Sequence, residues 1–177
     1  MKFEKMTIEE YANILGSKKS TPGGGSSLAL ILINALSLCQ MVCNFTKDKV
    51  GYEDFRNEVL TIEERVNILL KEAYYLLNAD SDSFLALMDA YKSKDEDRIA
   101  SSSIEACEVP YRLFVAAKET EVLASRLFEK GNKNVISDAK IAEDLCKAIY
   151  PGCRLNIKAN IKNIKKEEFI KKYSSIL

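Results

Sequence analysis

Apolar residues along most of the chain recur every three or four positions, which is the spacing of an α-helix rather than that of a β-strand. The clearest run lies between residues 52 and 91, which contain no glycine or proline. Its apolar positions form one seam, made of Val59, Ile62, Val66, Leu69, Ala73 and Leu76. A seam of this spacing predicts antiparallel packing against neighbouring helices. The expected fold class is therefore all-α, an antiparallel helical bundle.

Start and stop signals divide the rest of the chain into further helices. A capping box at Thr7 to Glu10 opens a short helix, and Asp95 starts another. Ser137 or Asp138 is expected to cap a later helix. Helices are expected to end or kink at three glycine or proline positions, namely Pro110, Gly131 and Pro151-Gly152. The chain of 177 residues is expected to form one domain, residues 1–177.

The segment from Ser26 to Thr46 contains no charged residue and has about the 20-residue length that a membrane-spanning helix needs. A polar stripe of Asn34, Ser37 and Asn44 nevertheless runs along it. Lipid would penalise this stripe, whereas a neighbouring helix could satisfy it. We therefore expect a buried helix and no membrane partner.

Composition narrows the chemistry that is open to this protein. The chain has no histidine, so acid–base steps must use Asp, Glu, Lys, Tyr or Cys. Its five cysteines form no CxxC pair, which favours reduced thiols in the cytoplasm and no metal site. Basic and acidic residues both number 26, so no overall charge attracts nucleic acid.

One position in the hydrophobic seam carries an acid. Four residues beyond Leu76 lies Asp80, followed on the same spacing by Phe84 and Leu87. A carboxylate at a core position is desolvated, which raises its pKa and suits it to proton transfer. The alternative is that the helix breaks at Asn78 and that Asp80 caps a second helix. The sequence leaves both interpretations open.

A glycine triplet precedes the uncharged segment, in the stretch Pro22-Gly23-Gly24-Gly25-Ser26. It lacks the lysine and spacing of a phosphate-binding P-loop. We expect a loop before a helix that begins near Ser26, with backbone N–H groups open to a ligand and some positive φ angles. A β-carbon on Gly24 is expected to intrude into that ligand space. Tight packing against a neighbouring helix is the alternative.

A second polar stretch runs from Gly131 to Asp138 and contains Asn132, Asn134 and Ser137. Its residues are sufficient for a connection between two helices, because glycine and asparagine favour turns and the hydroxyl or carboxylate favours a cap. The same amide and carboxylate groups could bind a ligand. The stretch alone does not separate these roles.

Taken in order, these pieces resemble the cyclodeaminase/methenyltetrahydrofolate cyclohydrolase family over nearly the whole chain. The motifs that carry the resemblance are TPGGGS at 21–26, DSDSFLALMDA at 80–90, EACEVP at 105–110, GNKNVISDA at 131–139, and Asn156 with Asn160. The resemblance implies an all-helical homodimer that binds a tetrahydrofolate derivative as substrate and needs no cofactor.

The resemblance also implies roles for individual residues. Asp80 and Asp138 are expected to be catalytic. The expected substrate-binding residues are Pro22, Gly23, Gly24, Gly25, Ser26, Asn132, Asn134, Ser137, Asn156 and Asn160.

The implied reaction is 5-formimidoyltetrahydrofolate cyclodeamination to 5,10-methenyltetrahydrofolate and ammonia. Methenyltetrahydrofolate cyclohydrolysis is the alternative, because it uses the same carbon. A folate-binding dimer without activity is a third, since Asn78 replaces the first acid of the family's Asp-x-Asp pattern and the segment from Ala90 to Arg98 is short.

Overall fold

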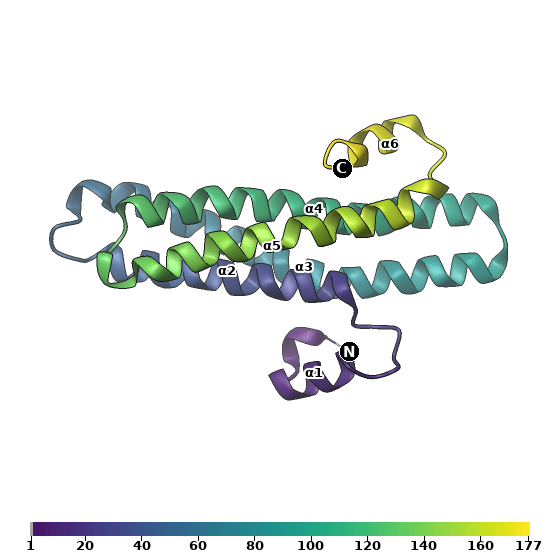
Figure 1. The fold of residues 1–177 in the computed structure, drawn as a ribbon, viewed down its shortest axis with the longest axis horizontal. Coiled ribbons are helices and arrows are strands. Elements are labelled where there is room, and N and C mark those ends of the chain that lie inside the picture. Colours follow the sequence, from purple (N-terminus) through teal and green to yellow (C-terminus); the bar gives the residue numbers. More distant parts are fainter. Residues whose placement is uncertain (1) are drawn as a thin grey trace.

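The computed structural model describes residues 2–177, which form six α-helices and four short 3-10 helices and contain no β-strand. Four long helices make an elongated bundle, with two short helices at its edges (Figure 1). The α-helices are α1 (Ile8–Leu15), α2 (Gly24–Thr46), α3 (Arg56–Ser93), α4 (Glu96–Lys130), α5 (Ile136–Asn160) and α6 (Glu167–Ser174). The 3-10 helices are η1 (Phe3–Lys5), η2 (Glu53–Phe55), η3 (Lys133–Val135) and η4 (Ile161–Asn163). The predicted all-α bundle is confirmed.

The long helices alternate in direction along the bundle. The helix α2 packs between α3 and α5 and faces α4 across the core. All six predicted seam residues of α3 are buried, with exposures from 0% to 4%. Leu32, Leu36 and Val42 of α2 are fully buried against them. The helical spacing of the apolar residues therefore identified the buried side of α3.

Two prolines that were expected to end or kink helices lie inside them. Pro110 sits within α4 and Pro151 within α5, which continues to Asn160. Each proline removes one backbone hydrogen bond, but packing of the apolar side against neighbouring helices supplies most of a helix's stability. The expectation that Pro151-Gly152 ends a helix is wrong.

Several predicted caps are confirmed and one is not. Thr7 forms the full capping box with Glu10, and Asp95 and Gly131 bound α4. However, α5 begins at Ile136 after the 3-10 helix η3, so neither Ser137 nor Asp138 is its N-cap.

By length and composition α2 could cross a membrane, but it is a core helix of this bundle. Of its most apolar window, 44% is buried against the other helices. Asn34, Ser37 and Asn44 all lie on its exposed side, so the predicted polar stripe does not face the core.

Candidate active site

The first turn of α2 is joined to the middle of α3 by a carboxylate. Asp80 Oδ2 accepts the backbone N–H of Ser26 at 2.9 Å and the Ser26 hydroxyl at 3.2 Å. First-turn N–H groups have no partner within their own helix. Gly23, at the N-cap position, has no side chain to satisfy them. Asp80 therefore caps α2 from a neighbouring helix.

The position of Asp80 settles one of the open alternatives, because α3 is unbroken from Arg56 to Ser93. Asp80 is not the cap of a second helix along the same chain segment. Burial raises the pKa of its carboxyl group, and the hydrogen bonds from Ser26 oppose that shift. Asp80 thus combines a cap contact with the raised pKa of a desolvated acid.

The three glycines differ in what surrounds them. A β-carbon on Gly25 would lie 1.8 Å from Asp80 Oδ1, so only glycine permits this contact between α2 and α3. Gly23 and Gly24 have no protein atom within 4 Å of such a β-carbon. The expected positive φ angles are absent, and α2 begins at Gly24 rather than near Ser26. The close contact with Asp80, not an unusual backbone angle, explains why position 25 needs a glycine.

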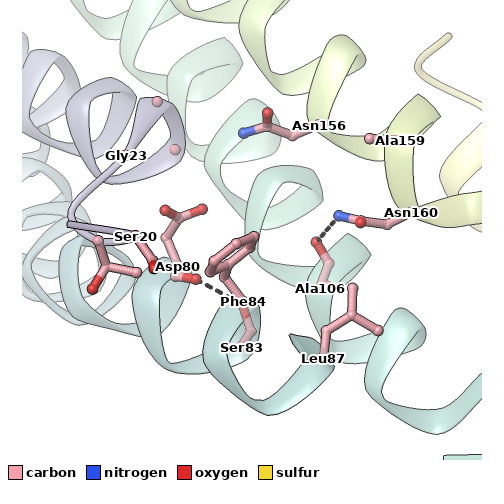
Figure 2. Close-up of a pocket in the computed structure, with 13 residues that line it drawn as sticks. Ser20, Gly23, Asp80, Ser83, Phe84, Leu87, Ala106, Asn156, Ala159 and Asn160 are labelled. Atoms are coloured by element: carbon pink, nitrogen blue, oxygen red, sulfur yellow. Dashed lines mark hydrogen bonds between the residues drawn. The ribbon is translucent and has the colours of Figure 1, made fainter. Parts of the chain in front are cut away.

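Asp80 borders a cavity of about 280 Å³ at the end of α2 (Figure 2). Gly23, Gly24 and Gly25 line one side, whereas Asn156 and Asn160 face it from α5. Pro22 is buried next to the glycines. The structure therefore brings together the three glycines, Asp80 and both late asparagines, whose roles toward a substrate stay predictions.

The two asparagines are not equivalent. Asn160 donates its side-chain amide to the carbonyl of Ala106 at 3.3 Å, which ties α5 to α4. The Asn156 side chain makes no hydrogen bond to any other residue within 2–177, and Figure 2 shows it over the cavity. Asn156 is therefore the amide with its hydrogen-bonding groups available to a ligand.

An aromatic residue of the cavity was predicted to be core. Phe84 lies one helical turn after Asp80, and its side chain is 38% exposed at the cavity. Helical spacing placed Phe84 on the same side as Asp80 but did not show that the seam opens there. Leu87, the next residue of the seam, is buried and also lines the cavity.

The second predicted motif lies at the other end of the bundle. Its glycine, Gly131, follows α4. The backbone N–H of Asn132 donates to Thr46 Oγ1, and its side-chain amide donates to the carbonyl of Phe45, both at the end of α2. The 23 residues of α2 separate these contacts from Gly24 by about 33 Å. Within one chain, Asn132, Asn134, Ser137 and Asp138 do not reach the cavity.

The residue at the first position of the Asp-x-Asp pattern does not line the cavity either. Asn78 accepts the Phe3 N–H at 3.0 Å and donates to Glu4 Oε2 at 2.8 Å, which holds η1 against α3. It faces a second, wider groove between α3, α4 and the N-terminal segment. Asn78 therefore contacts η1 and not the cavity beside Asp80.

Comparisons with known proteins agree with this fold. The chain is 33% identical to formiminotetrahydrofolate cyclodeaminase from Thermotoga maritima, with a TM-score of 0.93 that covers 98% of this chain and 87% of the other. It is 32% identical to methenyltetrahydrofolate cyclohydrolase of Methylorubrum extorquens, covering 92% of this chain and 83% of that protein.

Formimidoyltransferase-cyclodeaminase of Gallus gallus is 25% identical over 90% of this chain, which spans 31% of that longer protein. The model of the formiminotransferase-cyclodeaminase family matches residues 7–176. On this match, together with the resemblance in sequence and fold, the chain belongs to the formiminotransferase-cyclodeaminase family.

Proposed function

We propose that the protein is a formimidoyltetrahydrofolate cyclodeaminase with Asp80 as its acid–base group. The observation that carries the proposal is a partly buried carboxylate without a cationic partner at the wall of an open cavity. No Lys or Arg side chain within residues 2–177 lines this cavity or pairs with Asp80. A buried charge without a counter-ion favours a ligand that supplies the opposite charge.

The substrate chemistry fits that requirement. A protonated formimidoyl group and a methenyl bridge both carry a delocalised positive charge on the carbon that is attacked. Bound beside Asp80, such a cation would stabilise the carboxylate and lower its pKa relative to the empty cavity. The cavity volume of about 280 Å³ is small for a whole folate, so we assign it to the part of the substrate around the one-carbon unit.

The cyclodeaminase reaction needs one proton to move. N10 of the substrate attacks the formimidoyl carbon, and a tetrahedral centre forms between N5, N10 and the amino group. Asp80 accepts the proton from N10 and delivers it to the amino group, which leaves as ammonia while the methenyl cation remains. The raised pKa of Asp80 suits a group that both accepts and donates.

Cyclohydrolysis is the second candidate, and the relative from Methylorubrum extorquens favours it. Water would attack the methenyl carbon, and Asp80 would accept one of its protons. The bond to N5 would then break as the remaining hydroxyl proton is transferred to N5, which gives the 10-formyl product. The same carboxylate serves either reaction, so residue chemistry alone does not rank them.

One assay separates these possibilities. The purified protein is mixed with 5-formimidoyltetrahydrofolate, and methenyl absorbance and free ammonia are followed together. Formation of both in equal amounts supports the cyclodeaminase. Consumption of methenyltetrahydrofolate without activity on the formimidoyl compound supports the cyclohydrolase. Binding without turnover of either compound would overturn the enzymatic proposal and leave a folate-binding protein.

A further inference from the structure

The two carboxylate oxygens of Asp80 have different surroundings. Oδ2 accepts both the backbone N–H and the hydroxyl of Ser26. Oδ1 accepts no hydrogen bond within residues 2–177, and it lies beside Gly25 at the wall of the cavity. One oxygen is therefore available to a ligand, whereas the other is bonded inside the protein.

A second hydroxyl continues the hydrogen-bonded chain from Ser26. Ser26 Oγ lies 3.2 Å from Asp80 Oδ2 and 3.2 Å from Ser81 Oγ. Both serines are buried, with exposures of 0% and 4%. Because a hydroxyl group donates one hydrogen bond and can accept two, Ser26 can bond to Asp80 and to Ser81 at the same time.

The chain of hydroxyls ends at the second groove. Ser81 borders this groove of about 1110 Å³ between α3, α4 and the N-terminal segment. Thr21 and Ser83 line both the groove and the cavity, so the two spaces lie on either side of a wall that contains Asp80 and Ser81. The exposed carboxylate of Asp82 also lines the groove, which is therefore open to solvent.

Other titratable groups near Asp80 are unsuited to take its proton. Tyr11 of α1 and Cys153 of α5 both lie near it. Burial raises the pKa of the Tyr11 hydroxyl and raises that of the Cys153 thiol to about 12, and the charge of Asp80 acts in the same direction. Both groups therefore stay protonated near neutral pH. The facing helix α2 carries no charged residue, which leaves the serine hydroxyls as the path inside the protein.

The hydroxyl chain can bond to Asp80 in either protonation state. When Asp80 is ionised, Ser26 donates to Oδ2 and Ser81 donates to Ser26. When Oδ2 carries a proton, both bonds reverse, so that Asp80 donates to Ser26 and Ser26 donates to Ser81. Burial raises the pKa of Asp80, which favours the protonated form while the cavity holds no cation.

A ligand in the cavity changes what Asp80 needs. It displaces the water that could take a proton directly from the cavity side. Its positive charge beside Oδ1 favours ionised Asp80. Both candidate reactions begin with that ionised form, which accepts a proton from N10 or from water. The proton already on Asp80 must therefore leave by a route other than the filled cavity.

We propose that Ser26 and Ser81 form a proton relay from Asp80 to the second groove, through which Asp80 ionises as a cationic substrate fills the cavity. The proposal rests on the proposed function for the identity of the ligand. The O–H bond at Asp80 Oδ2 breaks as Ser26 Oγ takes the proton. Ser26 passes its own hydroxyl proton to Ser81 Oγ, and Ser81 passes its own to water in the groove. One proton leaves, and both serines end as neutral hydroxyls.

The variant Ser81→Ala tests the relay without any need for turnover. It removes the outer hydroxyl and leaves both bonds from Ser26 to Asp80 in place. The protein is mixed with methenyltetrahydrofolate in weak buffer, at a pH near the pKa of Asp80, in a stopped-flow instrument. Tyrosine fluorescence follows binding, methenyl absorbance follows hydrolysis, and a pH indicator follows proton release. Release that precedes any loss of absorbance belongs to binding.

The relay predicts a delay in proton release and no delay in binding. The wild type should release its proton at the rate of binding, whereas Ser81→Ala should bind at the same rate and release the proton at least about tenfold more slowly. Asp80→Asn should release none in this phase. The matched control is Ser27→Ala, since the Ser27 hydroxyl donates to the carbonyl of Gly23 at 2.9 Å and not to Asp80. It should behave as the wild type.

Several results would overturn the relay. They are release from Ser81→Ala at the wild-type rate, an equal delay in Ser27→Ala, and no release from the wild type on binding. A lower Tm of Ser81→Ala with unchanged release would leave Ser81 as a packing contact only. If the wild type released its proton through Ser81 but turned over neither folate, the proposed function would fail while the relay stood. Turnover with release that does not depend on Ser81 would give the reverse conclusion.

Discussion

Asp80 has two roles in this structure, and replacing it in two ways separates them. It caps α2 through Ser26, and it is the partly buried acid of the cavity. Asp80→Asn keeps an oxygen that can accept the Ser26 N–H but cannot exchange a proton near neutral pH. Asp80→Ala removes both functions.

The stability of the two variants should differ in a predictable direction. Loss of an N-cap costs about 1 kcal/mol. For a chain of this length, that corresponds to a Tm lower by about 2–4 °C in Asp80→Ala. Asp80→Asn should unfold at or above the wild-type Tm at pH 7. Burial raises the pKa of Asp80 in the folded state, so its charged form costs folding free energy.

The pH dependence of stability tests independently whether ionised Asp80 destabilises the folded state. As pH rises from the ordinary aspartate range through the raised pKa of Asp80, the folded wild type loses stability, because the unfolded chain ionises more readily. Asp80→Asn should lack this decrease. Melting curves of both proteins across the acid range measure the difference directly.

Activity then decides whether the acid is catalytic. If Asp80 moves the proton, Asp80→Asn should lower kcat by at least about a hundredfold. Steady-state turnover is compared with the Tm of the same preparation, so that loss of folding is not mistaken for loss of chemistry. An Asp80→Asn variant with near-normal kcat would refute the catalytic role and leave Asp80 as a cap.

Four further predictions concern the same cavity. Gly25→Ala should lower stability by about 1–3 kcal/mol and abolish turnover, because the new β-carbon collides with Asp80 Oδ1. Gly24→Ala should leave the Tm unchanged and weaken folate affinity, and a loss of Tm without a change in affinity would contradict this. Asn156→Ala should raise KM about tenfold through one lost hydrogen bond, with little effect on Tm, whereas Asn160→Ala should lower the Tm through its contact with Ala106. If ionised Asp80 is the form that accepts the proton, kcat/KM should fall as pH decreases through an apparent pKa above 3.8, and a flat profile across that range would exclude it.

The sequence alone determined the fold class and the buried side of α3. Helical spacing reports which residues leave water together, and the α3 seam from Val59 to Leu76 proved to be buried. The same spacing placed Asp80 on the buried side of its helix. These inferences succeed because they depend on neighbours three or four residues away.

Tertiary structure decided which distant residues share the site. Asn156 reaches Asp80's cavity from a helix 76 positions further along the chain, whereas the Gly131–Asp138 motif lies at the far end of α2. It also decided that Gly25 is the glycine required by close packing and that α5 continues through Pro151. Local spacing identifies the side of a helix that is buried but not the element that covers it. That choice depends on how four long helices align, which is a property of the packed bundle.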